Sequence, residues 1–239
     1  MNRFCCSLFR FPIPLFHRGS TNGYDSEKPV HSVTLTKDCY MGETEVTQAL
    51  WYAVMGQKPT SDGKQWSSTC GLGDNNPAYY ISWDDCQEFI TKLNQLTGQA
   101  FRMPTEAEWE YAARGGKRSN GYIYAGSNTI DDVAWYWDNI PSKSEGTSGY
   151  GTQPVQTKAA NELGLYDMTG NVWEWCQDRY GSSYYNSSPS TDPTGPDLGS
   201  DRVHRGGGWN SLANSCYVSF RINFTPDYRY PSLGLRLAL

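Results

Sequence analysis

Polar and apolar residues alternate where the folded part of the chain begins. The stretch 28–45 (KPVHSVTLTKDCYMGETE) has the two-residue period of half-buried strands and predicts strands at 30–36 and 39–44. Helical spacing then takes over. Thr47 is expected to cap a short helix that runs to about Met55, with Leu50, Trp51 and Val54 on one face.

A second helix is predicted from Ser82 as the N-cap to Gly98 as the C-terminal stop (SWDDCQEFITKLNQLTG). Its apolar positions recur at helical spacing: Cys86, Phe89, Ile90, Leu93 and Leu96. This is the strongest helix pattern in the chain.

A strand at 100–103 leads into a third helix (PTEAEWEYAARGG), for which Thr105 and Glu108 form a capping box. Trp109, Ala112 and Ala113 are expected to face inward. The glutamates Glu106, Glu108 and Glu110 allow two interpretations. They are either a catalytic acid/base pair or, as we favour, first-turn acids stabilised by the helix dipole.

The C-terminal part contains two apolar segments that resemble strands, one ending at Trp209 and one formed by Leu233, Leu235, Leu237 and Leu239. Between them, the segment 210–232 contains no Lys, Glu, Gln, Met or Trp and is rich in Tyr, Phe, Ser and Asn. Tyr and Phe give a large contact area at low entropic cost, and Ser and Asn give adaptable hydrogen bonds. This composition is typical of a paratope.

Composition limits the class of protein. The 239 residues suffice for one substantial core, and 14% aromatic residues with 24 glycines indicate a loop-rich domain held by aromatic packing. The net charge of −5 provides no extended basic surface, so we expect no nucleic acid partner. No apolar run is long enough to predict a transmembrane segment.

The N-terminal residues 1–16 (MNRFCCSLFRFPIPLF) are expected to be leader-like or disordered, ahead of one domain at 17–239. Arg10 interrupts their apolar patches, so as written they are a poor export signal. The seven cysteines are an odd number without zinc-type spacing, which excludes a complete disulfide framework within one chain. The residues His17, His31 and His204 lie far apart and show no metal-binding or catalytic spacing.

A candidate metal loop lies in the segment 164–175 (GLYDMTGNVWEW). Asp167 and Glu174 could supply carboxylates to a hard cation while Gly170 and Val172 supply backbone carbonyls, a set that suits Ca²⁺. The alternative is that Trp173 and Trp175 are core aromatics and that Glu174 pairs with an arginine.

Several blocks in order resemble the formylglycine-generating enzyme family: KPVHSVTL, YMGETEVTQALW, FRMPTEAEWEYAARGG, GLYDMTGNVWEW, RVHRGGGWN and LGLRL. The resemblance implies an α+β, C-type-lectin-like fold with short strands and two to three helices. It also implies a structural calcium site at the positions of Asp167, Gly170, Val172 and Glu174.

The enzymatic branches of that family are not matched. Copper-dependent members need two cysteines five residues apart, which our alignment places at Ala213 and Val218, and Cys216 has no partner there. An iron-dependent branch needs a histidine cluster that the sequence lacks. We therefore expect no copper or iron centre, with a divergent enzyme of the family as the alternative function.

The C-terminal segment has a frame of constant residues, which are Trp209, Ala213, Cys216, Arg221, Pro226, Asp227, Arg229 and the LGLR motif. This frame more closely resembles the variable proteins of diversity-generating retroelements, which include a spirochaete surface lipoprotein. There, mutagenised Asn codons ending in a pyrimidine cannot produce Lys, Glu, Gln, Met or Trp. The resemblance implies a diversified ligand-binding face whose ligand is an unknown protein or cell-surface molecule. It also implies a cell-surface or secreted location, with a lipid anchor as one form of attachment. The alternative location is the cytoplasm, because the N-terminus is a poor export signal. The implied variable positions are Asn210, Ser211, Leu212, Asn214, Ser215, Phe220, Ile222, Asn223, Phe224, Thr225, Tyr228, Tyr230, Pro231 and Ser232.

The alternative interpretation of the same segment is an ordinary lectin-type loop whose aromatic side chains pack inward. The two interpretations differ in the burial that they expect for Phe220, Phe224, Tyr228 and Tyr230. Under the first, these side chains are contact anchors on the surface. Under the second, they belong to the core.

Overall fold

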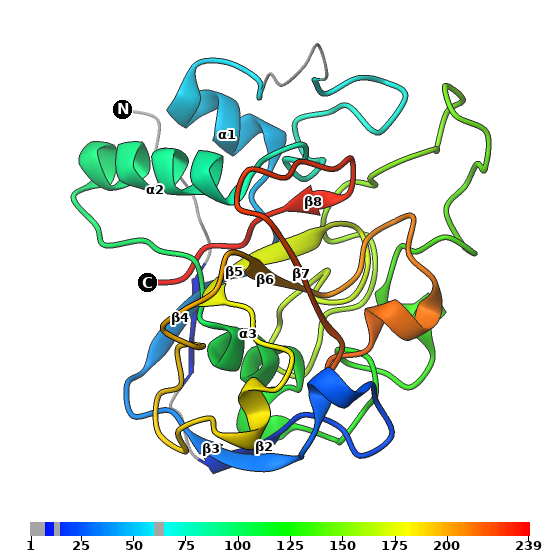
Figure 1. The fold of residues 1–239 in the computed structure, drawn as a ribbon. Helices are drawn as coiled ribbons and strands as arrows, with labels where there is room; N and C mark the ends of the chain where they lie inside the picture. Colours follow the sequence, from blue (N-terminus) through cyan, green and yellow to red (C-terminus); the bar gives the residue numbers. More distant parts are fainter. Residues whose placement is uncertain (1–7, 12–14, 60–64) are drawn as a thin grey trace.

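The computed structural model describes residues 8–11, 15–59 and 65–239 (Figure 1). It mixes short strands and helices with long irregular connections, as the α+β prediction requires. The strands are β1 (Leu8–Phe11), β2 (Leu15–Arg18), β3 (His31–Thr34), β4 (Cys39–Gly42), β5 (Trp173–Arg179), β6 (Arg202–Arg205), β7 (Arg221–Phe224) and β8 (Leu233–Gly234). The α-helices are α1 (Gln48–Met55), α2 (Trp83–Thr97), α3 (Glu106–Ala113) and the short α4 (Ile130–Val133), and 3-10 turns lie at Asp25–Glu27, Gly116–Arg118, Tyr184–Asn186 and Ala213–Cys216.

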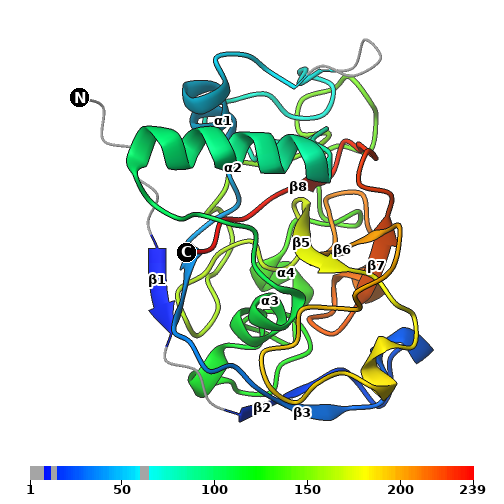
Figure 2. The same ribbon diagram turned by 60° about the vertical axis from the view of Figure 1, so that its left-hand side comes forward.

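A four-stranded sheet with the order β7-β6-β5-β8 lies at the centre, between α2 and α3 (Figures 1 and 2). Only the pair β5 and β8 is parallel. Trp175 on β5 packs into the core cluster that contains Phe89 of α2. Its neighbour Cys176 packs into the second cluster, with Trp109 of α3. Successive residues of β5 thus fill the two cores on opposite faces of the sheet.

The two predicted helices α1 and α2 are confirmed, together with their caps. The Thr47 hydroxyl accepts a hydrogen bond from the Leu50 backbone, and Ser82 forms a capping box with Asp85. Leu96 was expected on the buried face of α2 but is 57% exposed. It lies in the last turn of the helix, where the core no longer covers that face.

The capping box of α3 and the burial of Trp109, Ala112 and Ala113 are also confirmed. Glu106 and Glu108 lie in the first turn of α3, as the favoured interpretation of its glutamates states, but Glu110 does not. Glu106 and Glu110 are fully buried and bind arginines, which that interpretation does not include. Helical spacing predicts the inward face of α3, but the apolar residues of the helix do not indicate that charged side chains lie on that face as well.

The strand predicted to end at Trp209 ends earlier, at Arg205. Gly206 and Gly207 follow with φ angles of 97° and 80°, a left-handed conformation that breaks the strand. The predicted C-terminal strand is likewise reduced to Leu233–Gly234. Residues 232–238 are all buried, so the chain there is packed on every side without continuing the ladder. The strand expected at 100–103 is only a single bridge, between Arg102 and Ala238.

The N-terminal residues 1–7 and 12–14 lie outside the described residues. Residues 8–11, placed by the sequence in a leader-like segment, pair with β4, and the expected boundary at residue 16 falls inside β2, which pairs with β3. None of the helices in the described ranges has both the length and the apolar character needed to cross a bilayer.

A buried cluster of charged side chains joins four regions of the chain. Glu106 on α3 binds Arg221 of β7 through both carboxylate oxygens, at 2.7 and 2.8 Å, and Arg18 of β2 at 2.7 Å. Arg205 of β6 contacts Glu106 at 3.4 Å and also binds Glu110. The cluster therefore fixes β2, α3, β6 and β7 relative to one another.

Burial by itself would raise the pKa of the Glu106 carboxyl, but the guanidinium groups of Arg221 and Arg18 hold that pKa far below its ordinary value. The pKa of Glu110 is lowered in the same way, against burial, by Arg114 and Arg205. Both carboxyls are therefore ionised at any physiological pH. A carboxyl that holds no proton cannot act as a general acid, and the carboxylate oxygens of both residues are bound by arginines.

The change Glu106→Gln is expected to lower the free energy of unfolding by about 3–5 kcal/mol, because it leaves buried guanidinium groups without a counter-charge. Chemical denaturation measures this loss. The matched control is Glu88→Gln on the exposed face of α2, where the pair with Lys92 is solvated and the change should cost less than about 1 kcal/mol. Equal effects of the two changes would contradict a structural role for the cluster.

Candidate functional site

The segment 210–232 is held at both of its ends. The Trp209 backbone N–H donates to the carbonyl of Asn171 at 2.7 Å, and the Trp209 indole donates to the carbonyl of Pro231 at 3.0 Å. The Ser232 carbonyl accepts a hydrogen bond of 2.7 Å from the backbone of Trp173, the first residue of β5. The two ends are thus tied to each other and to the central sheet.

Contacts with residues outside the segment also hold it along its length. Arg221 is fixed by the buried cluster, and Arg229 binds the Asp85 carboxylate through two hydrogen bonds of 2.7 and 2.8 Å. The Pro226 carbonyl accepts the backbone N–H of Trp83 at 2.9 Å. Figure 1 shows the result, with the red connection between β7 and β8 lying beside one end of α2.

The predicted variable positions differ in how far solvent reaches them. Leu212, Asn214, Thr225 and Tyr230 are exposed, and Asn210, Ser215, Phe220, Ile222, Asn223, Phe224, Tyr228 and Pro231 are half-buried. Ser211 and Ser232 are buried. Twelve of the fourteen positions therefore reach solvent in whole or in part.

The two buried serines support the backbone. The Ser211 hydroxyl accepts the Gly208 backbone N–H at 3.0 Å, and the Ser232 hydroxyl donates to the Asn210 side chain at 2.7 Å. A Cβ added at Gly208 would lie 2.7 Å from the Ser232 Cβ, so this region has no room for larger side chains. The expectation that Ser211 and Ser232 contact a ligand does not match their burial.

The aromatic side chains of the segment form a stack that leads outward from the sheet. Phe224 lies on the buried His204 ring, with centroids 4.9 Å apart and an interplanar angle of 7°. Tyr228 stacks on Phe224 at 3.9 Å, and Tyr230 follows at 6.0 Å. Tyr230 is 40% exposed. These aromatic side chains are therefore neither fully buried nor without contacts, since each packs on the neighbouring ring that lies nearer the sheet.

A second aromatic group surrounds Phe220. Its ring centroid lies 5.9 Å from that of Trp173 and 5.5 Å from that of Tyr24. Trp173 is half-buried and also contacts His204, at 5.0 Å. Trp173 and His204 thus lie between the Phe220 side of the segment and the Phe224 stack.

His204 is uncharged in the fold. Its side chain is 1% exposed, and burial lowers the pKa of the imidazole to about 3. The rings of Trp173, Trp175 and Phe224 surround it, and Nδ1 has no hydrogen-bond partner in the described part of the chain. A residue with these properties serves as packing under the aromatic stack.

The loop predicted to bind calcium holds its two carboxylates in different ways. Both oxygens of Glu174 accept hydrogen bonds from Arg236, between 2.7 and 3.0 Å, and Oε2 also accepts the Trp109 indole at 2.6 Å. Asp167 accepts the Gln156 backbone N–H through Oδ2, while Oδ1 has no partner within the described residues. Burial raises the pKa of Asp167 to about 6.

In this arrangement Glu174 has the arginine partner of the alternative interpretation and no free lone pair for a metal. Gly170 and Val172 lie in the same turn, and Val172 donates its N–H to the buried Glu45 carboxylate at 2.9 Å. Of the two predicted carboxylate ligands, only Asp167 offers a free side-chain oxygen. Among the described residues, no three His, Cys, Asp or Glu side chains are placed to share a metal ion. Calcium stays a prediction.

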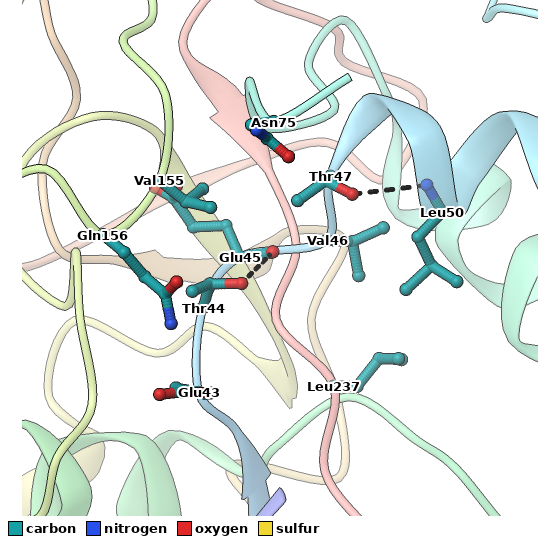
Figure 3. A pocket seen from close by; sticks show the side chains of 10 residues that line it. All are labelled: Glu43, Thr44, Glu45, Val46, Thr47, Leu50, Asn75, Val155, Gln156 and Leu237. Carbon is teal, nitrogen blue, oxygen red and sulfur yellow. Dashed lines mark hydrogen bonds between the residues drawn. The ribbon is translucent and has the colours of Figure 1, made fainter. Parts of the chain in front are cut away.

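A cavity of about 270 Å³ lies beside this loop, between the connection from β4 to α1 and residues 155–156 (Figure 3). Glu43, Glu45 and Gln156 are among the side chains that line it. It includes none of the predicted variable positions. The cavity and the segment 210–232 are thus separate features.

The cysteines do not match the spacing of the copper-binding pair in the family's oxidases. Cys216 is fully buried, and burial raises the pKa of its thiol to about 12, so it is not a thiolate at neutral pH. In the sequence no two cysteines are five residues apart, whichever alignment is used. Ala213 and Val218, aligned with the catalytic cysteines, provide no sulfur.

Sequence reasoning did not identify Trp173 as part of the site and treated it with Trp175 as a core residue. Both side chains lie on the same face of β5, because they are two residues apart. Trp175 is buried, with its indole donating to the Ile81 carbonyl, whereas Trp173 lies at the start of the strand and is half-buried. The sequence contains no signal that separates them.

The burial of His204 predicts how stability depends on pH. Because its pKa is lowered in the fold, the unfolded chain binds a proton below about pH 6.5 that the folded chain does not, and stability is lost as the pH falls. Between pH 7 and 4.5 the parent should lose about 2.5 kcal/mol more than His204→Leu in chemical denaturation. The control His17→Gln, on the exposed side of β2, should keep the parental slope, and an unchanged slope in His204→Leu would contradict this account.

Known proteins resemble this chain in both sequence and fold. Residues 14–239 match the family described as the sulfatase-modifying factor enzyme 1-like domain. Over 86% of the chain and 81% of the relative, the sequence is 33% identical to "Chaperone protein LppX" of Paenibacillus barcinonensis. It is 38% identical to the formylglycine-generating enzyme of Streptomyces coelicolor over 69% of the chain, but spans only about half (52%) of that enzyme's length.

Among solved structures, Treponema denticola variable protein 1 is similar with a TM-score of 0.82 and 31% identity, over 97% of this chain and 94% of that one. PvdO from Pseudomonas aeruginosa has a TM-score of 0.80 at 26% identity, over 99% and 95% of the two chains. These neighbours confirm the C-type-lectin-like α+β fold. The chain belongs to the family of the sulfatase-modifying factor enzyme 1-like domain, the family of the formylglycine-generating enzymes.

Proposed function

We propose that this protein is a non-enzymatic binding protein that presents a diversified ligand-binding face on a C-type-lectin-like scaffold, as a variable protein of a diversity-generating retroelement. The observation that carries the proposal is the segment 210–232. Its residue types are restricted to those that mutagenised Asn codons can give, and twelve of its fourteen implied variable positions reach solvent. The similarity to Treponema denticola variable protein 1 over nearly the whole chain supports the same function.

The anchors of the segment explain how side chains could change without loss of the fold. Trp209 and Pro226 are held through hydrogen bonds that include backbone groups, and Arg229 binds a constant carboxylate on α2. A substitution at Leu212 or Tyr230 removes none of these bonds. The variable residues therefore contribute contact area and polar groups to a ligand, and the frame contributes position.

The contact face proposed here comprises the twelve solvent-reaching positions and leaves out Ser211 and Ser232. Phe220, Phe224 and Tyr228 would supply buried aromatic area to a complex, because each is already held by a neighbouring ring and loses little freedom on binding. The ligand is a protein or another cell-surface molecule. A cell-surface or secreted location belongs to this proposal.

A second function is favoured by the relatives. The formylglycine-generating enzymes of Streptomyces coelicolor and Thermomonospora curvata are 38% and 35% identical to this chain, and the chain spans 52% and 65% of their lengths. An enzyme of this kind would need a metal centre other than a pair of cysteines five residues apart. Stoichiometric copper binding, abolished by Cys216→Ser, would favour this alternative.

The genetic test examines the DNA beside the gene. A template copy of the codons for residues 210–232 is expected, in which differences from the gene are confined to adenines of the template, next to a gene for a reverse transcriptase. The absence of both would overturn diversification.

The biochemical test is a displayed library in which the twelve positions carry codons of the form NNY. Most members should resist protease as the parent does, and selection against hen egg-white lysozyme should give binders of micromolar affinity or better. The matched control library also varies Ser211 and Ser232, and its protease-resistant fraction should fall because the backbone bonds of these serines are lost. Equal fractions in the two libraries would contradict the frame, and a library without binders would contradict the binding face.

A further inference from the structure

Trp173 is part of the frame but lies at the variable segment. Its backbone N–H donates to the Ser232 carbonyl at 2.7 Å, and it pairs with Leu233 in the parallel ladder of β5 and β8. These bonds use only the backbone of Trp173. The position of residue 173 is therefore fixed whatever its side chain is.

The ring of Trp173 lies between the two aromatic groups of the segment. It packs on Phe220 at 5.9 Å on one side and on His204 at 5.0 Å on the other, and His204 supports Phe224. The side chain remains half-buried in spite of these contacts. Part of Trp173 is thus left uncovered beside Phe220, one of the positions of the proposed contact face.

The indole N–H of Trp173 has no acceptor in residues 8–11, 15–59 and 65–239. The indoles of Trp66, Trp83, Trp109, Trp135, Trp175 and Trp209 each donate a hydrogen bond within the chain, whereas those of Trp51, which is buried, and Trp137, which is half-buried, share the lack of an acceptor in the described residues. An aromatic ring that keeps both an apolar surface and an unused donor is suited to contact another molecule.

The chemistry of the surrounding face limits what that molecule can be. None of the twelve solvent-reaching variable positions carries a charge. The guanidinium groups of Arg221 and Arg229 are bound by the carboxylates of Glu106 and Asp85. The exposed carboxylate of Asp227 lies in the segment but outside the variable positions. The rings of Trp173, Phe220 and Phe224 therefore offer apolar area and the indole N–H donor. An uncharged aromatic or aliphatic group beside a carbonyl oxygen is complementary to them, and protein side chains next to their own backbone provide that combination.

We infer that Trp173 is a constant anchor of the variable face and receives an apolar side chain of a protein ligand, with the indole donating to a backbone carbonyl of that ligand. This inference rests on the proposed function and deepens it. Mutagenised Asn codons cannot produce Trp, so the variable positions cannot supply an indole. The frame supplies one, in the residue type that contributes most often to binding hot spots.

The first experiment uses N-acetyl-phenylalanine methylamide as the probe, since it joins an aromatic ring to backbone carbonyls. The parent chain is labelled with ¹⁵N, and its indole N–H resonances are followed by NMR during the titration. The resonance that disappears in Trp173→Phe should shift saturably with the probe. That variant should lose about tenfold or more in probe affinity.

Trp135→Phe is the matched control. Trp135 is also half-buried, but its indole donates to Thr157 and its ring contacts Lys158, away from the segment. This variant should bind the probe as the parent does. A Trp173 resonance that stays unchanged, or equal loss in both variants, would overturn the inference. A shift with methyl β-glucoside but not with the amide would overturn the protein ligand in favour of a glycan.

The second experiment introduces Trp173→Phe into several lysozyme binders from the twelve-position library. Each should lose about tenfold or more in affinity, whatever its variable residues are, with an unchanged midpoint of thermal unfolding. Binders that tolerate the change would overturn the anchor and leave the proposed function standing. A probe that binds at Trp173 while the library gives no binders would support the contact at Trp173 and overturn the proposed function.

Discussion

The buried contact between Glu106 and its arginines determines where the other parts of the molecule lie. It is fully desolvated, so each charge is tolerated only while its partners remain in place. Arg18 comes from the N-terminal strand β2, and Arg205 and Arg221 come from β6 and β7. The two ends of the chain are thereby held to one helix, and the segment that follows β7 starts from a fixed point.

This constraint separates two kinds of residue within a short stretch of chain. Residues that hold the segment use backbone groups, a buried serine hydroxyl or an arginine paired with a carboxylate outside it, as Arg229 is with Asp85. The four aromatic residues among the twelve solvent-reaching positions rest on neighbouring rings, and Phe224 on His204 is the one with the most parallel planes. Polar contacts thus hold the scaffold, and the outward surface carries aromatic, aliphatic and uncharged polar side chains.

Much of the fold could be predicted because it depends on local signals. The capping boxes at Ser82 and Thr105 set the starts of α2 and α3 as the sequence indicates. The burial of Glu106 could not be predicted, since it depends on arginines far away in the sequence that only the folded chain brings together. The half-exposure of Trp173 has a similar cause, because strand alternation gives it the same face as Trp175 and only the surrounding elements distinguish the two.

The place of β7 in the sheet has a consequence for proline. β7 is an edge strand that pairs only with β6, so every second backbone N–H along it points away from the ladder. The pyrimidine-ending codons that encode many residue types also encode proline, which cannot donate a hydrogen bond and is excluded from the interior of a sheet. At an edge, half of the sites can accept it. A random change to proline in β7 is thus survivable at these sites, whereas the same change in β5 would break the central sheet.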